Sequence, residues 1–324
     1  QWTTIPLALH GAVVLGDGSK VEVKIGEDEG DPVFYISDLL PHLSQKQNTK
    51  TLAEAFSGED LNIWLGNIPY TAAKEDGDKT VKENLLHILN EKYGIKEEDF
   101  LSAELSLVPA YKARDIGFDR ALIGAYGHDD RVCSYPAFSA LFDTETDGKT
   151  VMVVLADKEE IGSEGTTGMQ CAIFTDLIDA IAASFDTTSA VIRAHSKCLS
   201  ADVNAAYDPN FKDVNEPMNS TYVSCGAGLT KFTGARGKSG SNDASAEFMA
   251  EIRKVFNDEG VIWQTGELGK VDQGGGGTVA KFIAKMNIDT VDIGVAVVSM
   301  HAPYEVISKA DVYEMYLACK AFMK

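Results

Sequence analysis

The sequence predicts an α/β protein in which a β-rich region precedes a larger domain with a mixed, mostly parallel sheet flanked by helices. Up to Pro109, short runs of alternating apolar and polar residues dominate, and such runs are typical of half-buried strands. From about Tyr111 onward, strand-like and helix-like segments alternate, which favours an α/β domain. A length of 324 residues also favours two domains. We therefore expect domains at residues 1–108 and 109–324.

The β-rich region begins with a predicted hairpin. Ala12–Leu15 and Lys20–Lys24 alternate apolar and polar residues on either side of a loop that contains glycine. Val81–Tyr93 carries an apolar stripe at helical spacing, and Gly94 follows as a stop signal. The same patterns predict strands at Pro32–Ile36, Leu61–Leu65 and Ser102–Pro109, a short helix at Asp38–Ser44, and a polar loop over residues 66–80.

The second region begins its alternation with a strongly apolar segment. Val151–Ala156 is a near-continuous apolar run, which is typical of a strand buried on both faces. The remaining segments predict further strands at Val191–Ala194, Tyr222–Cys225, Val261–Gln264 and Val291–Val298, and helices at Gly168–Ser184, Ala244–Asn257 and Tyr304–Met323.

Composition excludes several classes of partner. With 29 Lys and Arg against 49 Asp and Glu, the net charge is −20, and nucleic acids and anionic membranes both require a basic face. The excess of acid favours cations, metals included. Five scattered cysteines without a C-x-x-C pair indicate reduced thiols, and no run is long enough for a membrane helix, so we expect a cytoplasmic protein. Because the chain opens at Gln1 directly into strand-like sequence, we also expect that an N-terminal segment is missing.

Polar residues follow several of the predicted strands at the point where each strand ends. Asp129 lies in an Asp-Asp-Arg sequence, Glu159 and Glu160 follow the apolar run, Asp202 closes Ser-Ala-Asp, and His301 closes Ser-Met-His. Functional side chains gather at the carboxyl ends of strands in open α/β sheets. Carboxylates with one imidazole can hold a divalent metal, and a neighbouring carboxylate can act as a general base.

Each cluster also has a purely structural interpretation. The Asp129–Arg131 sequence can cap a helix, a Glu-Glu pair is usually solvated, Asp202 can cap a turn, and a single histidine such as His301 is often a partly buried packing residue. The four clusters together favour the metal site. No G-x-S-x-G, Walker A or Rossmann motif is present. Gly274–Gly277 is either a flexible loop or an anion-binding turn.

At these residues the sequence resembles a known family. The motifs, in chain order, are GHDDRVCSY, DKEEIGSEG, SADVNAAYDPNF and SMHAPYE. Together they resemble the aminopeptidase I / aspartyl aminopeptidase family of dinuclear metallopeptidases, and the opening QWTTIPLALHG is similar as well. The resemblance covers the whole chain. It implies that residues 1–108 are a β-rich dimerisation domain inserted into an α/β peptidase domain, whose N-terminal part is missing here.

The resemblance also implies roles for individual residues. Asp129 would bridge two divalent metal ions, zinc or alternatively cobalt or manganese, with Asp130 behind it. Glu160 and His301 would bind one ion and Asp202 the other.

Two further residues would act in catalysis. Glu159 would be the general acid/base, and His42, from the insert of a neighbouring subunit, would reach the active site. A further ligand of the family, the His of an H-x-D motif, has no match, because His10 and His128 lie in other sequence contexts.

The function implied is a metal-dependent aminopeptidase that releases N-terminal residues from peptides by attack of a metal-bound hydroxide, with Glu159 as base. Dimers would assemble into a tetrahedral dodecamer. A carboxypeptidase or deacylase on a related fold is one alternative, and a catalytically impaired homologue or fragment that acts as an assembly scaffold is another. Lys231 and Arg236 are candidate cations for an acidic substrate side chain.

Overall fold

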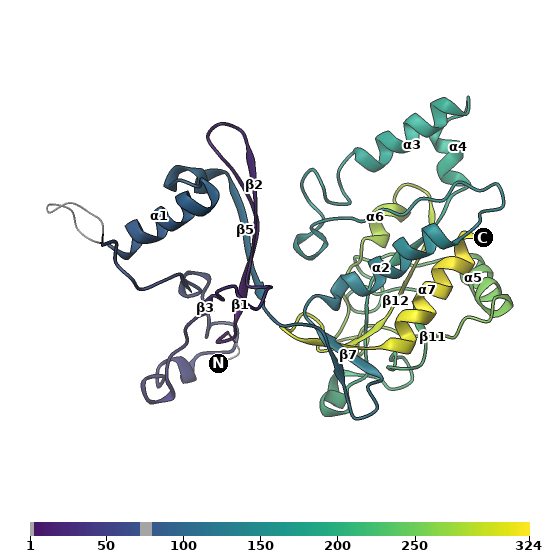
Figure 1. Ribbon diagram of the computed structural model, residues 1–324. Coiled ribbons are helices and arrows are strands. Elements are labelled where there is room, and N and C mark those ends of the chain that lie inside the picture. Colours follow the sequence, from purple (N-terminus) through teal and green to yellow (C-terminus); the bar gives the residue numbers. More distant parts are fainter. Residues whose placement is uncertain (1–2, 72–79) are drawn as a thin grey trace. The chain divides into compact units, whose positions relative to one another are not determined.

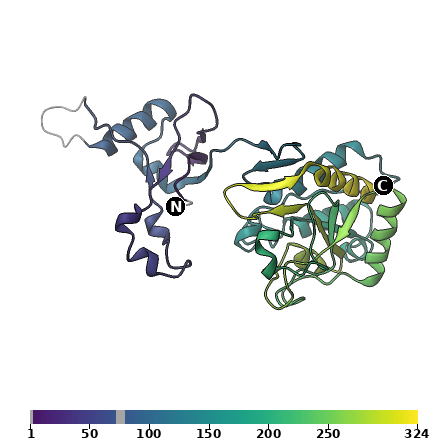
Figure 2. The same cartoon turned by 90° about the horizontal axis from the view of Figure 1, so that it is seen from below.

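The computed structural model describes residues 3–71 and 80–324, and the chain forms two compact units, Gln1–Lys112 and Ala113–Lys324 (Figures 1 and 2). In the first unit, an antiparallel sheet has the strand order β2-β1-β5. Its strands are β1 (Leu7–Val14), β2 (Lys20–Ile25) and β5 (Ala103–Pro109). The predicted hairpin is confirmed, since Val14 pairs with Lys20 across the turn. Among the described residues, no helix is long and apolar enough to cross a membrane.

One face of this sheet carries the core of the first unit. Helix α1 (Val81–Tyr93) begins with a capping box between Thr80 and Glu83 and ends at Gly94, whose φ of 72° suits glycine. Val13 of β1 is fully buried, and Leu89 and Tyr93 of the helix pack against the same cluster. The helix predicted from the apolar stripe therefore has the observed boundaries.

The remaining elements of the first unit are short. The predicted strands Pro32–Ile36 and Leu61–Leu65 shrink to β3 (Tyr35–Ile36) and β4 (Ile63–Trp64). The helix predicted at Asp38–Ser44 is a single 3₁₀ turn, at Pro41–Leu43. Further 3₁₀ turns lie at Gln47–Thr49, Gly58–Asp60 and Glu97–Ser102. Of the loop predicted over residues 66–80, residues 72–79 lie outside the described residues.

The second unit contains two mixed sheets. The four-stranded sheet has the order β11-β10-β12-β8 and the five-stranded sheet the order β6-β7-β14-β13-β9. The first sheet consists of β8 (Lys197–Ala201), β10 (Ala227–Thr230), β11 (Trp263–Thr265) and β12 (Asp289–Gly294). The second consists of β6 (Arg114–Ile116), β7 (Leu122–Ala125), β9 (Asn204–Ala205), β13 (Ala296–Val298) and β14 (Glu305–Ser308).

The two sheets continue into each other along one pair of chains. Beyond β8 and β12, the backbone N–H of Asp202 donates to Ile293 O and that of Asn204 donates to Val295 O. The strand predicted at Val291–Val298 is therefore β12 and β13, interrupted only at Val295. The mixed sheet is confirmed, but the five-stranded sheet is mostly antiparallel, because only β9 and β13 run parallel in it.

Helices cover the sheets of the second unit. They are α2 (His128–Asp143), α3 (Ile173–Ser184), α4 (Ser189–Ala194), α5 (Ala246–Asp258), α6 (Ala280–Ala284) and α7 (Lys309–Met323). Helices α5 and α7 lie side by side (Figures 1 and 2). Phe256 of α5 and Met315 of α7 are fully buried in one core with Ile293 of β12. Further 3₁₀ turns lie at Glu159–Ile161 and Pro209–Val214.

Four predicted elements of this unit are wrong in type or place, and three of them are short segments or helix starts. Val191–Ala194 belongs to helix α4, whose start is capped by the side chain of Thr188, which accepts the N–H of Val191. Tyr222–Cys225 is not a strand, and the strand begins two residues later, at Ala227. The helix predicted at Tyr304–Met323 begins only at Lys309, since its first residues form β14.

The apolar run Val151–Ala156 is not a strand buried on both faces. Val151 and Val153 pack against the main core, whereas Met152, Val154 and Leu155 are exposed, Leu155 by 59%. Among the described residues, no strand pairs with this segment. The apolar pattern is therefore that of a strand, but one face and the hydrogen-bonding edge have no partner within residues 3–71 and 80–324.

Candidate metal centre

The predicted metal ligands lie close together in the second unit. Asp129 follows β7 at the beginning of α2, where Asp129 and Asp130 have non-helical backbone angles and share a cis peptide bond. Asp202 directly follows β8, and His301 lies between β13 and β14. Glu160 lies on the 3₁₀ turn Glu159–Ile161, after the exposed apolar segment. Chain segments far apart in sequence thus meet at the ends of neighbouring strands.

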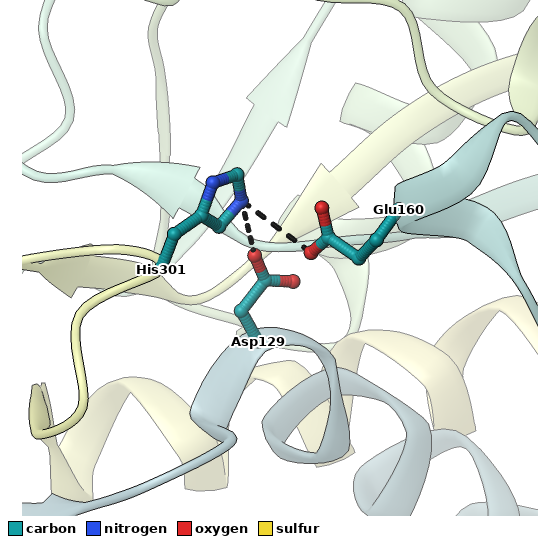
Figure 3. A group of neighbouring side chains, drawn as sticks. All are labelled: Asp129, Glu160 and His301. Carbon is teal, nitrogen blue, oxygen red and sulfur yellow. Dashed lines mark ion pairs between the residues drawn. The ribbon is translucent and has the colours of Figure 1, made fainter. Parts of the chain in front are cut away.

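Asp129, Glu160 and His301 form the first group of candidate ligands (Figure 3). The Nε2 atom of His301 lies 2.9 Å from Oδ2 of Asp129 and 3.4 Å from Oε1 of Glu160. The side chain of Asp129 is 8% exposed, whereas those of Glu160 and His301 are 57% and 62% exposed. One imidazole and two carboxylates therefore converge with one side open to solvent.

A second group shares Asp129 with the first. One oxygen from each of Asp129, Asp130 and Asp202 lies within 4.8 Å of the others. Asp130 Oδ1 is buried without a hydrogen-bond partner. Gly294 permits the close approach of the Asp202 backbone, because a Cβ at Gly294 would lie 1.6 Å from Asp202 O. The sequence analysis placed Asp130 behind the ligands, whereas the structure brings its carboxylate to the same spacing as theirs.

The carboxyl groups of this cluster resist losing their protons. Burial and the charge of Glu160 raise the pKa of Asp129 to about 7. Burial and the charge of Asp129 raise the pKa of Asp130 to about 8, and burial and the charge of Asp130 raise that of Asp202 to about 9. Buried carboxylates this close to one another disfavour the charged form unless a cation neutralises them.

The residues present fit zinc. The first group offers three protein ligands, one nitrogen and two oxygens, and three ligands with an open fourth position are typical of catalytic zinc. The second group offers carboxylates only, which suit harder ions better than zinc. A bound cation would satisfy the unpartnered oxygen of Asp130 and offset the burial that raises the pKa of this carboxyl group.

Glu159 lies directly beside the first group. Burial and the negative charge of Glu160 raise its pKa, while the charges of His301 and Lys281 oppose the shift. Its turn is held tightly, because Gly162 N donates to Glu159 O and Ser163 N donates to Lys158 O. A half-buried carboxylate with a raised pKa next to a metal group is suited to accept and return a proton.

Other residues singled out in the sequence lie elsewhere. His42 is exposed on the Pro41–Leu43 turn of the first unit, where His10 pairs with Glu27. His128 turns its Nε2 atom to Ile123 O and belongs to neither metal group. Lys231 pairs with Asp243. These contacts give His10, His128 and Lys231 partners outside the metal groups.

The Gly274–Gly277 segment is a loop, as expected. The N–H of Gly274 donates to Lys270 O and that of Gly276 to Thr233 O. These two amides are therefore occupied within the protein, which disfavours the anion-binding interpretation.

Sequence reasoning missed one residue of the site, Glu305. It is the last letter of the SMHAPYE motif, but nothing in its spacing distinguishes it from a solvated glutamate. In the structure it begins β14 and is buried, and both its oxygens accept backbone N–H groups from candidate ligands. This role becomes visible only because the segment is a buried strand. The sequence pattern had predicted a helix at this position.

Metal binding is expected to strengthen as the pH rises from 6 to 9. Without metal, the raised pKa values keep Asp129, Asp130 and Asp202 partly protonated, so that each ion must displace protons. Because these pKa values are raised in the folded state, the protonated carboxyl groups stabilise the metal-free protein at a pH below 3.8, the ordinary pKa of an aspartate. This stabilisation is lost as the pH rises through the folded-state pKa values of about 7 to 9. Calorimetric titration with zinc in two buffers of different ionisation enthalpy measures the protons released. Zinc binding without proton release would contradict the raised pKa values.

Comparisons with known proteins show which family and fold this chain resembles. The family described as aminopeptidase I zinc metalloprotease (M18) matches residues 1–323. A probable M18 family aminopeptidase 1 of Clostridium acetobutylicum is 49% identical over 327 residues, which cover 100% of this chain and 70% of the relative. A crystal structure of an M18 family aminopeptidase from Thermotoga maritima matches with a TM-score of 0.94 and 45% identity, covering 100% of this chain and 72% of that one. The mApe1 dodecamer of Saccharomyces cerevisiae, at 20% identity and a TM-score of 0.70, covering 99% of this chain and 69% of that one, shares the fold.

Proposed function

The chain belongs to the M18 family of aminopeptidase I zinc metalloproteases, which are hydrolases, and on this premise we propose how its residues release N-terminal residues from peptides. One observation carries the proposal: Asp129, Glu160 and His301 present their ligand atoms within 4.8 Å of one another in a chain 49% identical to a probable M18 aminopeptidase. The assignment of individual roles below rests on this convergence and on the family motifs.

The two groups of ligands would hold two ions that share Asp129. Asp129, Glu160 and His301 would hold a zinc ion, and Asp129 with Asp202 would hold a second divalent ion, with Asp130 beside it. Zinc bound there would supply a Lewis acid that polarises the scissile carbonyl and lowers the pKa of water. The imidazole makes the first group the tighter zinc site, because the second offers only carboxylates.

Glu159 would move the proton. Its carboxylate takes a proton from the attacking water and returns it to the nitrogen of the departing amine. Support comes from its position beside Glu160 and from the burial that raises its pKa above the ordinary value of a glutamate. The free N-terminal amine of the substrate would lie against the carboxylates of the centre, which are suited to a cation.

Peptides with a free N-terminus are expected to be cleaved, and the same peptides with an acetylated N-terminus to resist cleavage by at least ~10²-fold, because blocking removes a group the site is built to pair. The measurement is the release of the first residue by the complete gene product, with and without 1,10-phenanthroline. Full activity in the presence of the chelator would contradict a metal enzyme. Equal cleavage of the blocked peptide would favour the carboxypeptidase or deacylase alternative.

The scaffold alternative is not favoured. A protein that served only assembly would gain nothing from four carboxyl groups that are held together against their mutual repulsion, with an imidazole beside them. The sequence similarity to the M18 aminopeptidases also covers the whole chain and is not confined to the first unit.

We also propose that the first unit, with a boundary near residue 108, joins subunits in a homo-oligomer. Its surface around His42 supports this, because Leu39, Leu40 and Leu43 are all exposed beside that histidine. Exposed apolar patches of this kind mark interaction sites. Dimers joined in this way could build the dodecamer of the tetrahedral type that the family motifs imply. Five free cysteines support a reducing compartment such as the cytoplasm.

If His42 acts in the active site of a neighbouring subunit, two inactive variants are expected to restore each other. His42→Ala removes a donor that would stabilise the oxyanion, a loss of roughly 10²–10³ in rate. Mixed with Glu159→Gln subunits, it forms some sites that contain both an intact His42 and an intact Glu159. The measurement is the activity of the mixed complete gene products after verified subunit exchange. No recovery would mean that His42 acts within its own subunit or not at all.

A further inference from the structure

The carboxylate of Glu305 joins two candidate ligands of the metal centre through their backbones. Its Oε1 atom accepts the N–H of His301 at 2.8 Å, and its Oε2 atom accepts the N–H of Asp129 at 3.1 Å. The residue is 2% exposed and begins β14, opposite Ala125 of β7. Asp129 follows β7 and His301 precedes β14, so Glu305 lies between the two loops that carry them.

Neither ligand has a backbone conformation that regular secondary structure would fix. His301 has a φ of 65°, in the left-handed region that residues other than glycine seldom occupy. Asp129 has a ψ of 111°, outside the helical range, although it lies at the beginning of α2. The left-handed conformation of His301 persists only where the surroundings determine it. A charged carboxylate that accepts both N–H groups is a strong determinant of this kind.

We propose that Glu305 is a positioning residue of the metal centre, which sets the spacing of Asp129 and His301 by holding the N–H of each. Glu305 belongs to neither group of candidate ligands, and each of its oxygens accepts a backbone N–H group. The metal centre of the proposed function is its premise. Partners that orient metal ligands in this way typically change metal affinity ~10–100-fold when they are removed.

The chain offers a matched control for this proposal. Asp311 of α7 is also a fully buried carboxylate that accepts two backbone N–H groups, those of Ser224 and Gly226, each at 2.7 Å. Neither donor belongs to the metal groups. Asp311→Asn and Glu305→Gln make the same chemical change, since an amide has one accepting oxygen and presents an NH₂ group to the other N–H. Both variants should lower the thermal stability of the metal-free protein.

The experiment measures zinc affinity by competition with a chromophoric chelator, using the complete gene product as wild type and as each variant. We expect Glu305→Gln to bind zinc ~10–100-fold more weakly, and Asp311→Asn to stay within about threefold of wild type. Glu305→Asp, which keeps the charge but is one methylene shorter, should fall between wild type and Glu305→Gln and serves if the glutamine variant does not fold.

Two results would overturn the proposal. Wild-type zinc affinity in the Glu305 variants would remove the positioning role, and an equal loss in Asp311→Asn would assign the effect to general destabilisation. A wild-type protein that binds no zinc would instead contradict the proposed function, so the two failures are distinguishable.

Discussion

Asn in place of Asp129 is expected to remove zinc from both ligand groups and to abolish peptide hydrolysis. Asp129 is the residue that the two groups share, and its side chain is nearly buried at their centre. The amide keeps the shape of the carboxylate but cannot supply a negative charge to a cation. The loss should therefore exceed the ~10–100-fold that follows from removing a partner behind a ligand. The backbone N–H that donates to Glu305 is unchanged, so the loop should keep its place.

The measurement is elemental analysis after dialysis, together with the rate of peptide hydrolysis. Asp130→Asn is the matched control, because Asp130 is the sequence neighbour of Asp129 and belongs to the second group alone. It should keep one zinc per subunit, held by Glu160, His301 and Asp129. If the Asp129→Asn protein still holds one tight zinc, the ligand set proposed here is wrong.

Glu159→Gln is expected to keep its zinc and to lose at least ~10² in turnover, because the side chain can no longer take a proton from water. The substitution preserves the size of the side chain, and Glu159 is not among the residues of either metal group.

Turnover and zinc content are measured on the same preparation, which separates loss of the proton carrier from loss of the metal. Glu164→Gln is a suitable control: Glu164 is exposed on the same loop, and its contact is with the side chain of Gln170. A Glu159→Gln enzyme with near-normal turnover would assign the proton transfer to another group.

The sequence was informative where chemistry and local pattern coincide. Asp129, Glu160 and His301 follow strands or turns in recognisable motifs, and the structure brings all three together. The hairpin and α1 were predictable because their turn, cap and stop residues are local signals. The part each residue plays in catalysis stays a prediction.

Other features depended on contacts that sequence alone does not reveal. Val191–Ala194 is helical, and the side chain of Thr188 accepts the N–H of Val191 at the start of this helix. The pairing of Glu305 with Ala125 on β7 decides that the Glu305 segment is a strand and places its carboxylate against Asp129. The position of the Asp130 carboxylate near those of Asp129 and Asp202 follows from the irregular start of α2, which no helix signal predicts.

The exposed segment Val151–Ala156 has a consequence for colloidal behaviour. The segment exposes three apolar side chains, those of Met152, Val154 and Leu155. The net charge of −20 opposes association of these surfaces, because it makes copies of the chain repel one another at long range. Added salt shortens the range of that repulsion to about 3 Å at 1 M but leaves the apolar attraction intact. An extended edge without a partner among the described residues can then template strand-to-strand association. High salt should therefore promote precipitation of this protein, whereas it protects many other proteins from aggregation driven by charge. Dilute, low-salt buffers should keep this protein in solution.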